Sequence, residues 1–252
     1  MSDEHLLSVR GVSVSFGGVD VLHGVDLGAD AGFTGLIGPN GAGKTTLFNV
    51  ITGYVRPRAG EVYLDGVALH GKDAYQVARL GVARTFQTPK LVGEMAVLDN
   101  AMLGIDGRAG ARRLGRSFGT RRSERATRAE AAELLERFGL GRHLRVPAGM
   151  LSLGSQKIIE VARALLARPR LLLLDEPAAG LSGPDVEALA RPLAEFASSG
   201  LAILIVEHDL ELVKRLCPTV VVLEFGTVLA AGAPEEVTRR KEVVAAYLGG
   251  ET

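Results

Sequence analysis

Residues 38–45, which read GPNGAGKT, constrain this chain more than any other feature. They match the pattern G-x-x-x-x-G-K-[ST] in full. A short strand predicted over 33–37 precedes them, and a helix predicted from Lys44 to Gly53 follows, which is the context that the pattern requires. Glycines let backbone N–H groups turn towards phosphate oxygens, and the N-terminus of a helix favours anions. The alternative is a strand, a turn and a helix with a chance Gly-Lys-Thr, but pattern and context together predict a phosphate-binding loop.

Two side chains of this loop have separate predicted roles. Lys44 is expected to reach the β- and γ-phosphates of ATP, and the Thr45 hydroxyl is expected to bind Mg²⁺. The loop and the start of the helix supply the predicted nucleotide-binding residues Gly38, Pro39, Asn40, Gly41, Ala42, Gly43, Lys44, Thr45 and Thr46.

A second candidate site follows the apolar run at 171–174. A fully apolar run suits a central parallel strand that is buried on both faces, and ligands bind beyond the carboxyl ends of such strands. Asp175 is therefore predicted to hold Mg²⁺, and Glu176 to orient or deprotonate an attacking water. The alternative is that both carboxylates only cap the following turn.

The order of the predicted elements indicates an α/β fold. Strands with alternating apolar residues are expected over 7–16 and 19–27, and a further strand over 81–86. Beyond Gly154, predicted helices and strands alternate, which favours a parallel sheet. These elements are a helix from 154, strands at 170–174 and 201–206, helices at 184–198 and 209–216, and strands at 220–223 and 227–230.

The composition changes after Gln87, and residues 88–150 are predicted to form a helical insertion that includes a helix at 130–138. Within it, 108–128 contains a single acid, Glu124, against eight arginines: Arg108, Arg112, Arg113, Arg116, Arg121, Arg122, Arg125 and Arg128. A solvated helical face is the favoured interpretation. Contact with lipid headgroups or an acidic partner is an alternative. Nucleic acid is a third, although Phe118 is the only aromatic residue in the stretch.

Overall composition excludes several classes of protein. Lys plus Arg and Asp plus Glu are 29 each, which argues against a protein that coats nucleic acid. Cys217 is the only cysteine, so no intrachain disulfide forms and a reducing compartment fits. No apolar run approaches the length of a membrane span, and the first residues, MSDEHLLSVR, lack the apolar core of a secretory signal. The mean hydropathy of +0.20 is high, and a large core is the favoured explanation over an exposed apolar surface.

The order of these motifs resembles the ATP-binding subunit of ABC transporters over nearly the whole chain. The family signature LSGGQ corresponds to LSLGS at 151–155. Ser152 and Gly154 match the signature, while Leu153 and Ser155 depart from it. The resemblance implies that Ser152 and Gly154 contact a nucleotide held by a second subunit.

The resemblance implies three further site residues. Gln87 lies where the family has its Q-loop and would contact Mg²⁺ or the lytic water. His208 corresponds to the switch histidine near the γ-phosphate, and Phe16 to the aromatic residue that stacks on adenine. A loop amide, a helix-start residue and a core aromatic are the respective alternatives. Residues 178–182 match the D-loop, with Ser182 where Asp is common in the family.

The resemblance also implies the architecture: a P-loop NTPase (RecA-like) core with an N-terminal antiparallel β subdomain and an inserted helical subdomain. Residues 1–252 would form one nucleotide-binding domain, with the helical insertion at 88–150 and a short C-terminal helical tail at 232–252. Short segments at 35–40, 83–87, 175–181 and 206–209, and the tail, resemble the LivG-type ATPases of branched-chain amino acid importers. That subfamily also includes importers of urea and short amides.

The function that the resemblance implies is ATP hydrolysis coupled to uptake. Two MgATP would bind between two ATPase subunits, identical or homologous, at the cytoplasmic face of the cell membrane. Transmembrane permease subunits, and indirectly a solute-binding protein, would complete the importer, and no nucleic acid is expected. An apolar patch within 91–103, including Met95 and Leu98, is expected to contact the permease. The alternatives are the ATPase of another transport system, an ABC protein acting on ribosomes or DNA, and a nucleotide-binding regulator without hydrolysis.

Overall fold

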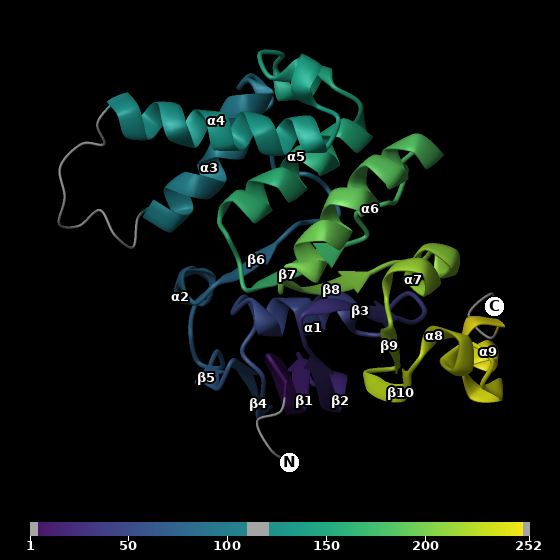
Figure 1. Cartoon of the computed structure of the whole chain (residues 1–252). Coiled ribbons are helices and arrows are strands. Elements are labelled where there is room, and N and C mark those ends of the chain that lie inside the picture. The colour runs from purple at the N-terminus through teal and green to yellow at the C-terminus, as the bar shows by residue number, and fades with distance from the viewer. Residues whose placement is uncertain (1–4, 110–120, 249–252) are drawn as a thin grey trace.

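The computed structural model describes residues 5–109 and 121–248 and contains two sheets (Figure 1). A four-stranded antiparallel sheet has the order β2-β1-β4-β5, and a six-stranded sheet has the order β10-β9-β3-β8-β7-β6. The strands are β1 Leu7–Phe16, β2 Val19–Ala29, β3 Gly32–Ile37, β4 Ala59–Leu64, β5 Val67–Ala68, β6 Val82–Arg84, β7 Leu171–Asp175, β8 Ala202–Val206, β9 Thr219–Glu224 and β10 Thr227–Gly232.

The larger sheet has helices on both faces. The described α-helices of the chain are α1 Lys44–Ile51, α2 Ala74–Arg79, α3 Val97–Ala109, α4 Arg121–Arg137, α5 Leu153–Leu166, α6 Gly183–Ser198, α7 Leu210–Leu216, α8 Pro234–Val237 and α9 Lys241–Leu248. In Figure 1, α5 and α6 lie above the sheet, while α1 and the antiparallel sheet lie below it. This confirms the predicted α/β core with its antiparallel β subdomain.

The inner strand β7, which lies between β8 and β6, shows why the core sheet takes this form. All of its residues are buried, and alternate side chains enter two different cores. Leu172 and Leu174 pack with the helices on one face, whereas Leu171 and Leu173 pack with α1 and the antiparallel sheet on the other. A strand buried on both faces needs apolar residues at every position, and the run at 171–174 supplies them.

The antiparallel sheet is built from hairpins. β1 pairs with β2 through a turn at Gly17 and Gly18, which both have positive φ. β4 pairs with β5 through Asp65 and Gly66, with φ values of 48° and 72°. Positive φ at both central residues is the backbone that a tight two-residue hairpin requires.

One helix of the helical insertion differs from the prediction. The helix predicted at 130–138 begins at Arg121, because its first half is a polar stretch without an apolar period to identify it. Residues 110–120, with part of the Arg-rich stretch, lie outside the described residues. Arg128 is exposed and pairs with Asp99 of α3, with 2.5 Å between Nη2 and Oδ1.

The apolar patch expected at 91–103 is only partly at the surface. Val97 and Leu98 are buried in the core that α3 shares with α5, so the expectation that Leu98 forms a contact surface is wrong. Val92 and Leu103 are exposed. The strand predicted at 81–86 is also shorter, spanning β6 alone, with Val82 as its buried residue.

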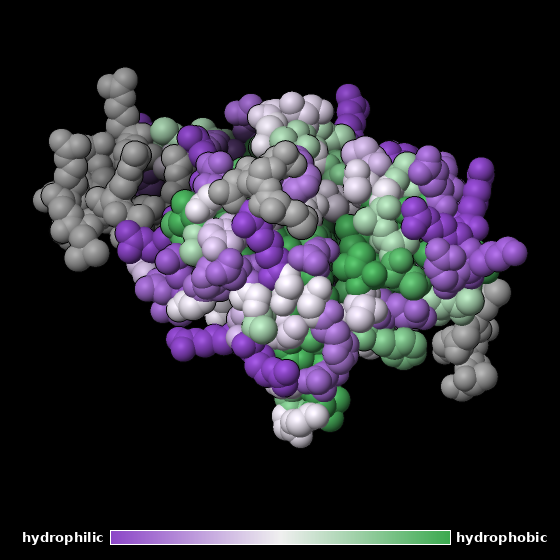
Figure 2. All heavy atoms as spheres, turned by 90° about the horizontal axis from the view of Figure 1, so that it is seen from below, coloured by the Kyte–Doolittle hydropathy of each residue, from purple (hydrophilic) through white to green (hydrophobic). Residues whose placement is uncertain are grey.

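The C-terminal tail packs on the edge of the core sheet through α8 and α9. Val237 and Val243 are buried there, while 249–252 lie outside the described residues. On the face seen from below, hydrophilic side chains surround smaller apolar patches (Figure 2), which fits a hydropathy carried mainly by the core. Within 5–109 and 121–248, no helix is long and apolar enough to cross a membrane.

Candidate functional site

The loop between β3 and α1 has the backbone that its glycines predict. Gly38, Gly41 and Gly43 have φ values of 144°, 79° and 102°. A Cβ at Gly38 would lie 1.9 Å from the Leu223 carbonyl oxygen, so only glycine fits there. The loop therefore lies tightly against β9 and turns into the N-terminus of α1, which Gly43 caps.

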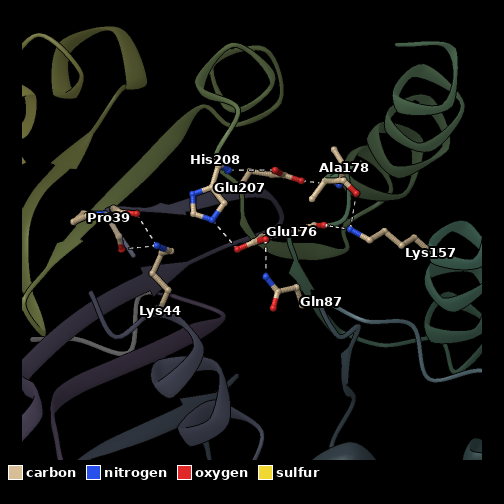
Figure 3. Close-up of polar contacts among 10 residues, drawn as sticks. Pro39, Lys44, Gln87, Lys157, Glu176, Ala178, Glu207 and His208 are labelled. Atoms are coloured by element: carbon tan, nitrogen blue, oxygen red, sulfur yellow. Dashed lines mark hydrogen bonds and ion pairs between the residues drawn. The ribbon is translucent and has the colours of Figure 1, made fainter. Parts of the chain in front are cut away.

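The Lys44 side chain folds back over this loop (Figure 3). Its Nζ donates to the carbonyl oxygens of Gly38 at 2.6 Å and Pro39 at 2.9 Å. Burial lowers the pKa of Lys44, and the charges of Glu176 and Asp175 oppose that shift. A cation is thus held inside the loop where phosphate oxygens are expected, and Thr45 and Thr46 occupy the first turn of α1 beside it.

Three loops meet at the carboxyl edge of the core sheet. β3, β7 and β8 are parallel, with Asp175 aligned with Val206 and Leu36 also aligned with Val206. The loop after each strand therefore starts at the same level, which brings Glu176 and His208 next to the 38–45 loop. Asp209 accepts hydrogen bonds from Glu211 N and Leu212 N as the N-cap of α7, which fixes the chain directly after His208.

Glu176 joins the two other predicted catalytic residues (Figure 3). Its Oε1 lies 2.6 Å from His208 Nε2, and its Oε2 accepts a hydrogen bond from Gln87 Nε2 at 3.0 Å. Burial alone would raise the pKa of Glu176, but these hydrogen bonds and the charges of His208 and Lys44 bring it below its ordinary value. The carboxylate is therefore ionised at neutral pH and oriented from both sides.

The matching family model, described as ABC transporter, covers residues 22–179. The chain belongs to the ABC transporter family. The cassette is 39% identical to the high-affinity branched-chain amino acid transport ATP-binding protein BraF of Pseudomonas aeruginosa, over 97% of this chain and 98% of that protein. It is 38% identical, over the same shares, to the corresponding protein LivG of Escherichia coli.

Solved cassettes have the same fold. A nucleotide-free ATP-binding cassette from an ABC transporter superposes with a TM-score of 0.83 at 29% identity, over 96% of this chain and 98% of that one. A cassette in its ADP conformation gives a TM-score of 0.83 at 29% identity, over 97% and 98%. The resemblance read from the motifs and the predicted fold class are both confirmed.

The cassette presents oxygen donors that suit Mg²⁺. The Thr45 hydroxyl, the Asp175 carboxylate and the Gln87 amide are the predicted ligands, and hard oxygen donors are what this cation prefers. Thr45 is exposed at the start of α1, while Asp175 is buried at the end of β7. These residues fit a cation that takes few protein ligands and completes its shell with phosphate and water.

Sequence reasoning missed Arg84, which contacts Asp175 directly. Its Nη2 donates to Asp175 Oδ2 at 3.0 Å and its Nη1 to Asn49 Oδ1 at 2.6 Å. The guanidinium carbon also lies 5.4 Å and 5.1 Å from the ring centroids of Phe48 and Phe86. The signal that could have identified Arg84 is its place in the predicted strand at 81–86, three residues before Gln87.

A second missed pair holds the backbone beyond Glu176 (Figure 3). Lys157 Nζ donates to the carbonyl oxygens of Glu176 and Ala179, both at 2.8 Å. Glu207 accepts from the amides of Ala178 at 2.7 Å and His208 at 3.2 Å. Both side chains are buried, so each backbone contact replaces hydration that the charged group has lost.

Ser152 and Gly154 lie at the N-terminus of α5, directly after the helical insertion at 88–150. Ser152 is the N-cap and accepts a hydrogen bond from Ser155 N at 3.2 Å. A Cβ at Gly154 would lie 2.6 Å from Leu181 Cδ2, so glycine allows close packing on the D-loop segment. Ser152 forms its side-chain hydrogen bonds with Ser155, within the first turn of α5, and its contact with a second subunit stays a prediction.

Phe16 is half-exposed at the end of β1, and its contact with adenine also stays a prediction.

A groove of about 580 Å³ separates the catalytic core from the helical insertion. α2 and β6 form one wall and α3 and α5 the other, with Tyr75, Arg84, Phe86, Leu103 and Arg163 among the lining residues. Phe86 therefore lines the groove, while Gln87, the next residue in the sequence, donates a hydrogen bond to Glu176.

Proposed function

We propose that this chain is the ATP-hydrolysing subunit of an ABC importer for branched-chain amino acids. The contact of Glu176 with both His208 and Gln87, beside Lys44 and its loop, is the observation that carries the catalytic part. The importer part is supported by relatives 38–39% identical over nearly the whole chain, which are branched-chain amino acid transport ATP-binding proteins.

Each residue of the site has an assigned task in this proposal, and Gln87 has two. The amides of 38–45 and Lys44 bind the phosphates, Thr45 and Asp175 hold Mg²⁺ with Gln87, and Phe16 stacks on the base. Mg²⁺ neutralises charge that develops on the phosphates. Glu176 accepts a proton from the attacking water, for which its ionised state prepares it. His208 and Gln87 hold that carboxylate in place.

A second ATPase subunit completes each site. Ser152 and Gly154 lie at the N-terminus of a 14-residue helix, where the helix dipole favours an anion. They are proposed to contact the γ-phosphate of ATP held by the P-loop of that second subunit.

The permease is proposed to dock in the groove between the core and the helical insertion, at the cytoplasmic face of the membrane. Tyr54 and Tyr75 expose apolar rings at its rim, and Phe86 in its wall is next to Gln87. A permease segment seated there would sense the position of the Q-loop. A solute-binding protein would deliver the substrate to the other side.

An uptake assay in proteoliposomes tests the proposal. The chain is reconstituted with the permease subunits, the second ATPase subunit and the solute-binding protein encoded beside it, and labelled leucine, isoleucine and valine are supplied. Uptake is expected to require ATP and to disappear with Lys44→Ala. Uptake of urea or short amides in place of the amino acids would reassign the substrate, and failure to associate with the permease would favour an ABC protein outside transport.

A further inference from the structure

The segment 86–90, which carries Gln87, is tied at both ends to helix α5. Glu160 of that helix accepts a hydrogen bond from Phe86 N on Oε2 at 3.1 Å and from Lys90 N on Oε1 at 3.0 Å. Arg163, one turn further along, donates to the Lys90 carbonyl oxygen at 2.7 Å. One carboxylate thus spans the segment, and a guanidinium fastens its far end.

The Glu160 carboxylate is specialised for this contact. Its side chain is 2% exposed, and burial raises its pKa although both amides and the Arg163 and Lys90 charges oppose that shift. Arg163 Nη2 lies 3.3 Å from Glu160 Oε1 and supplies a cation whose side chain is 21% exposed. Buried carboxylates are costly unless every oxygen is paired, so the two amides and the guanidinium are required partners.

This contact lies between the signature residues at the start of α5 and Gln87, which orients the proposed base. α5 begins at the Ser152 cap and carries Glu160 two turns later. Gln87 lies between the two amides that Glu160 holds, and donates to the Glu176 carboxylate. A rigid helix therefore connects the signature residues to the side chain that orients the proposed base.

We propose that Glu160, with Arg163, is a positioning residue that holds Gln87 against Glu176 and makes the Q-loop segment move together with α5. The inference rests on the proposed roles of Gln87 and Glu176. Glu160 itself would touch neither nucleotide nor water, and would act on turnover only through Gln87.

Amide exchange of the purified full-length chain tests the contact without any need for turnover. Glu160→Gln keeps the shape of the side chain but leaves one acceptor for two amides. Exchange in the 86–90 segment is expected to rise at least about tenfold. Glu130→Gln is the matched control, since Glu130 pairs with Arg168 beyond the end of α5 and does not contact that segment. Unchanged exchange in Glu160→Gln would overturn the contact.

Steady-state hydrolysis of ATP tests the positioning role. Glu160→Gln is expected to lower kcat by about tenfold while KM for ATP stays within about twofold, because Gln87 is displaced and the P-loop is not. In a Gln87→Ala background the same substitution is expected to have no further effect on kcat. An equal loss in both backgrounds would show that Glu160 acts only through general stability and would overturn the role.

Arg163→Lys keeps the inference testable if Glu160→Gln folds poorly. Lysine retains the cation beside Glu160 but lacks the fork that reaches both Glu160 and Lys90. Arg163→Lys is expected to raise amide exchange in the 86–90 segment, and to lower kcat only when Gln87 is present, both by less than Glu160→Gln does. If neither effect is seen, the proposal is overturned. A wild-type chain that fails to hydrolyse ATP would contradict the proposed function, and the exchange result would still decide whether the contact exists.

Discussion

Arg84 and Asp175 form an ion pair at the base of the proposed Mg²⁺ site, with side chains only 6% and 7% exposed. The pair connects β6, at the sheet edge next to the groove, with the carboxylate at the end of β7. Because Asn49 and the rings of Phe48 and Phe86 fix the guanidinium, the Asp175 carboxylate is oriented before any cation binds.

Removing the arginine leaves a buried carboxylate without its partner. Arg84→Met is expected to lower the free energy of unfolding by about 3–5 kcal/mol, measured by urea denaturation. Asp175→Asn in the same chain should recover part of the loss, since no charge then remains unpaired. Arg168→Met removes an exposed pair with Glu130 and should cost less than about 1 kcal/mol. Equal losses in Arg84→Met and Arg168→Met would contradict this account.

Lys44→Ala is expected to abolish ATP binding or turnover. Lys44 is the cation inside the loop, and a charge-assisted contact with phosphate is among the stronger interactions available. Binding is measured with a fluorescent ATP analogue and turnover by phosphate release. Turnover within about twofold of wild type would remove Lys44 from the phosphate site.

Glu176→Gln is expected to retain ATP binding and to slow hydrolysis at least about 100-fold, the range for loss of a general base. The amide keeps the size of the side chain but cannot accept the proton. The variant should also accumulate as an ATP-dependent dimer, which gel filtration with MgATP detects. A monomer with normal turnover would make Asp175 or His208 the better candidate for the base.

The motif-bearing parts of this site are predictable from the sequence, whereas the residues that support them are not. Lys44, Asp175 and Glu176 are identified by local patterns at strand ends. Arg84 and Glu160 contact groups 91 and 74 residues away, and no local pattern encodes those partners. The burial of Leu98 could not be predicted either, because an apolar residue at helical spacing does not reveal whether another helix covers it.

Mixed dimers test the proposed contact between subunits. Ser152→Arg disrupts the signature of one chain and Lys44→Ala the P-loop of another. If Ser152 and Gly154 act across the interface, mixing the two variants should restore hydrolysis that neither shows alone. No recovery in a mixture shown to dimerise would contradict the composite site. Where the natural partner is a different ATPase subunit, the same variants are placed in that pair.

Docking of the permease is tested by two substitutions, one at an exposed residue of the groove and one at a buried residue of α3. Tyr75 is 62% exposed at the groove, whereas Leu98, on the buried side of α3, is 9% exposed. Tyr75→Glu should weaken pull-down with the permease while changing the free energy of unfolding by less than about 0.5 kcal/mol, as is usual at a surface position.

Leu98→Asp should instead cost at least about 2 kcal/mol, because it buries a charge in the core shared by α3 and α5, and any loss of pull-down would follow from that instability. ATP binding by the isolated chain should survive Tyr75→Glu, since Tyr75 lines the groove and no residue of the 38–45 loop does. Intact stability with intact pull-down in Tyr75→Glu would remove this groove from the permease interface. Intact stability with lost pull-down in Leu98→Asp would return the contact to α3.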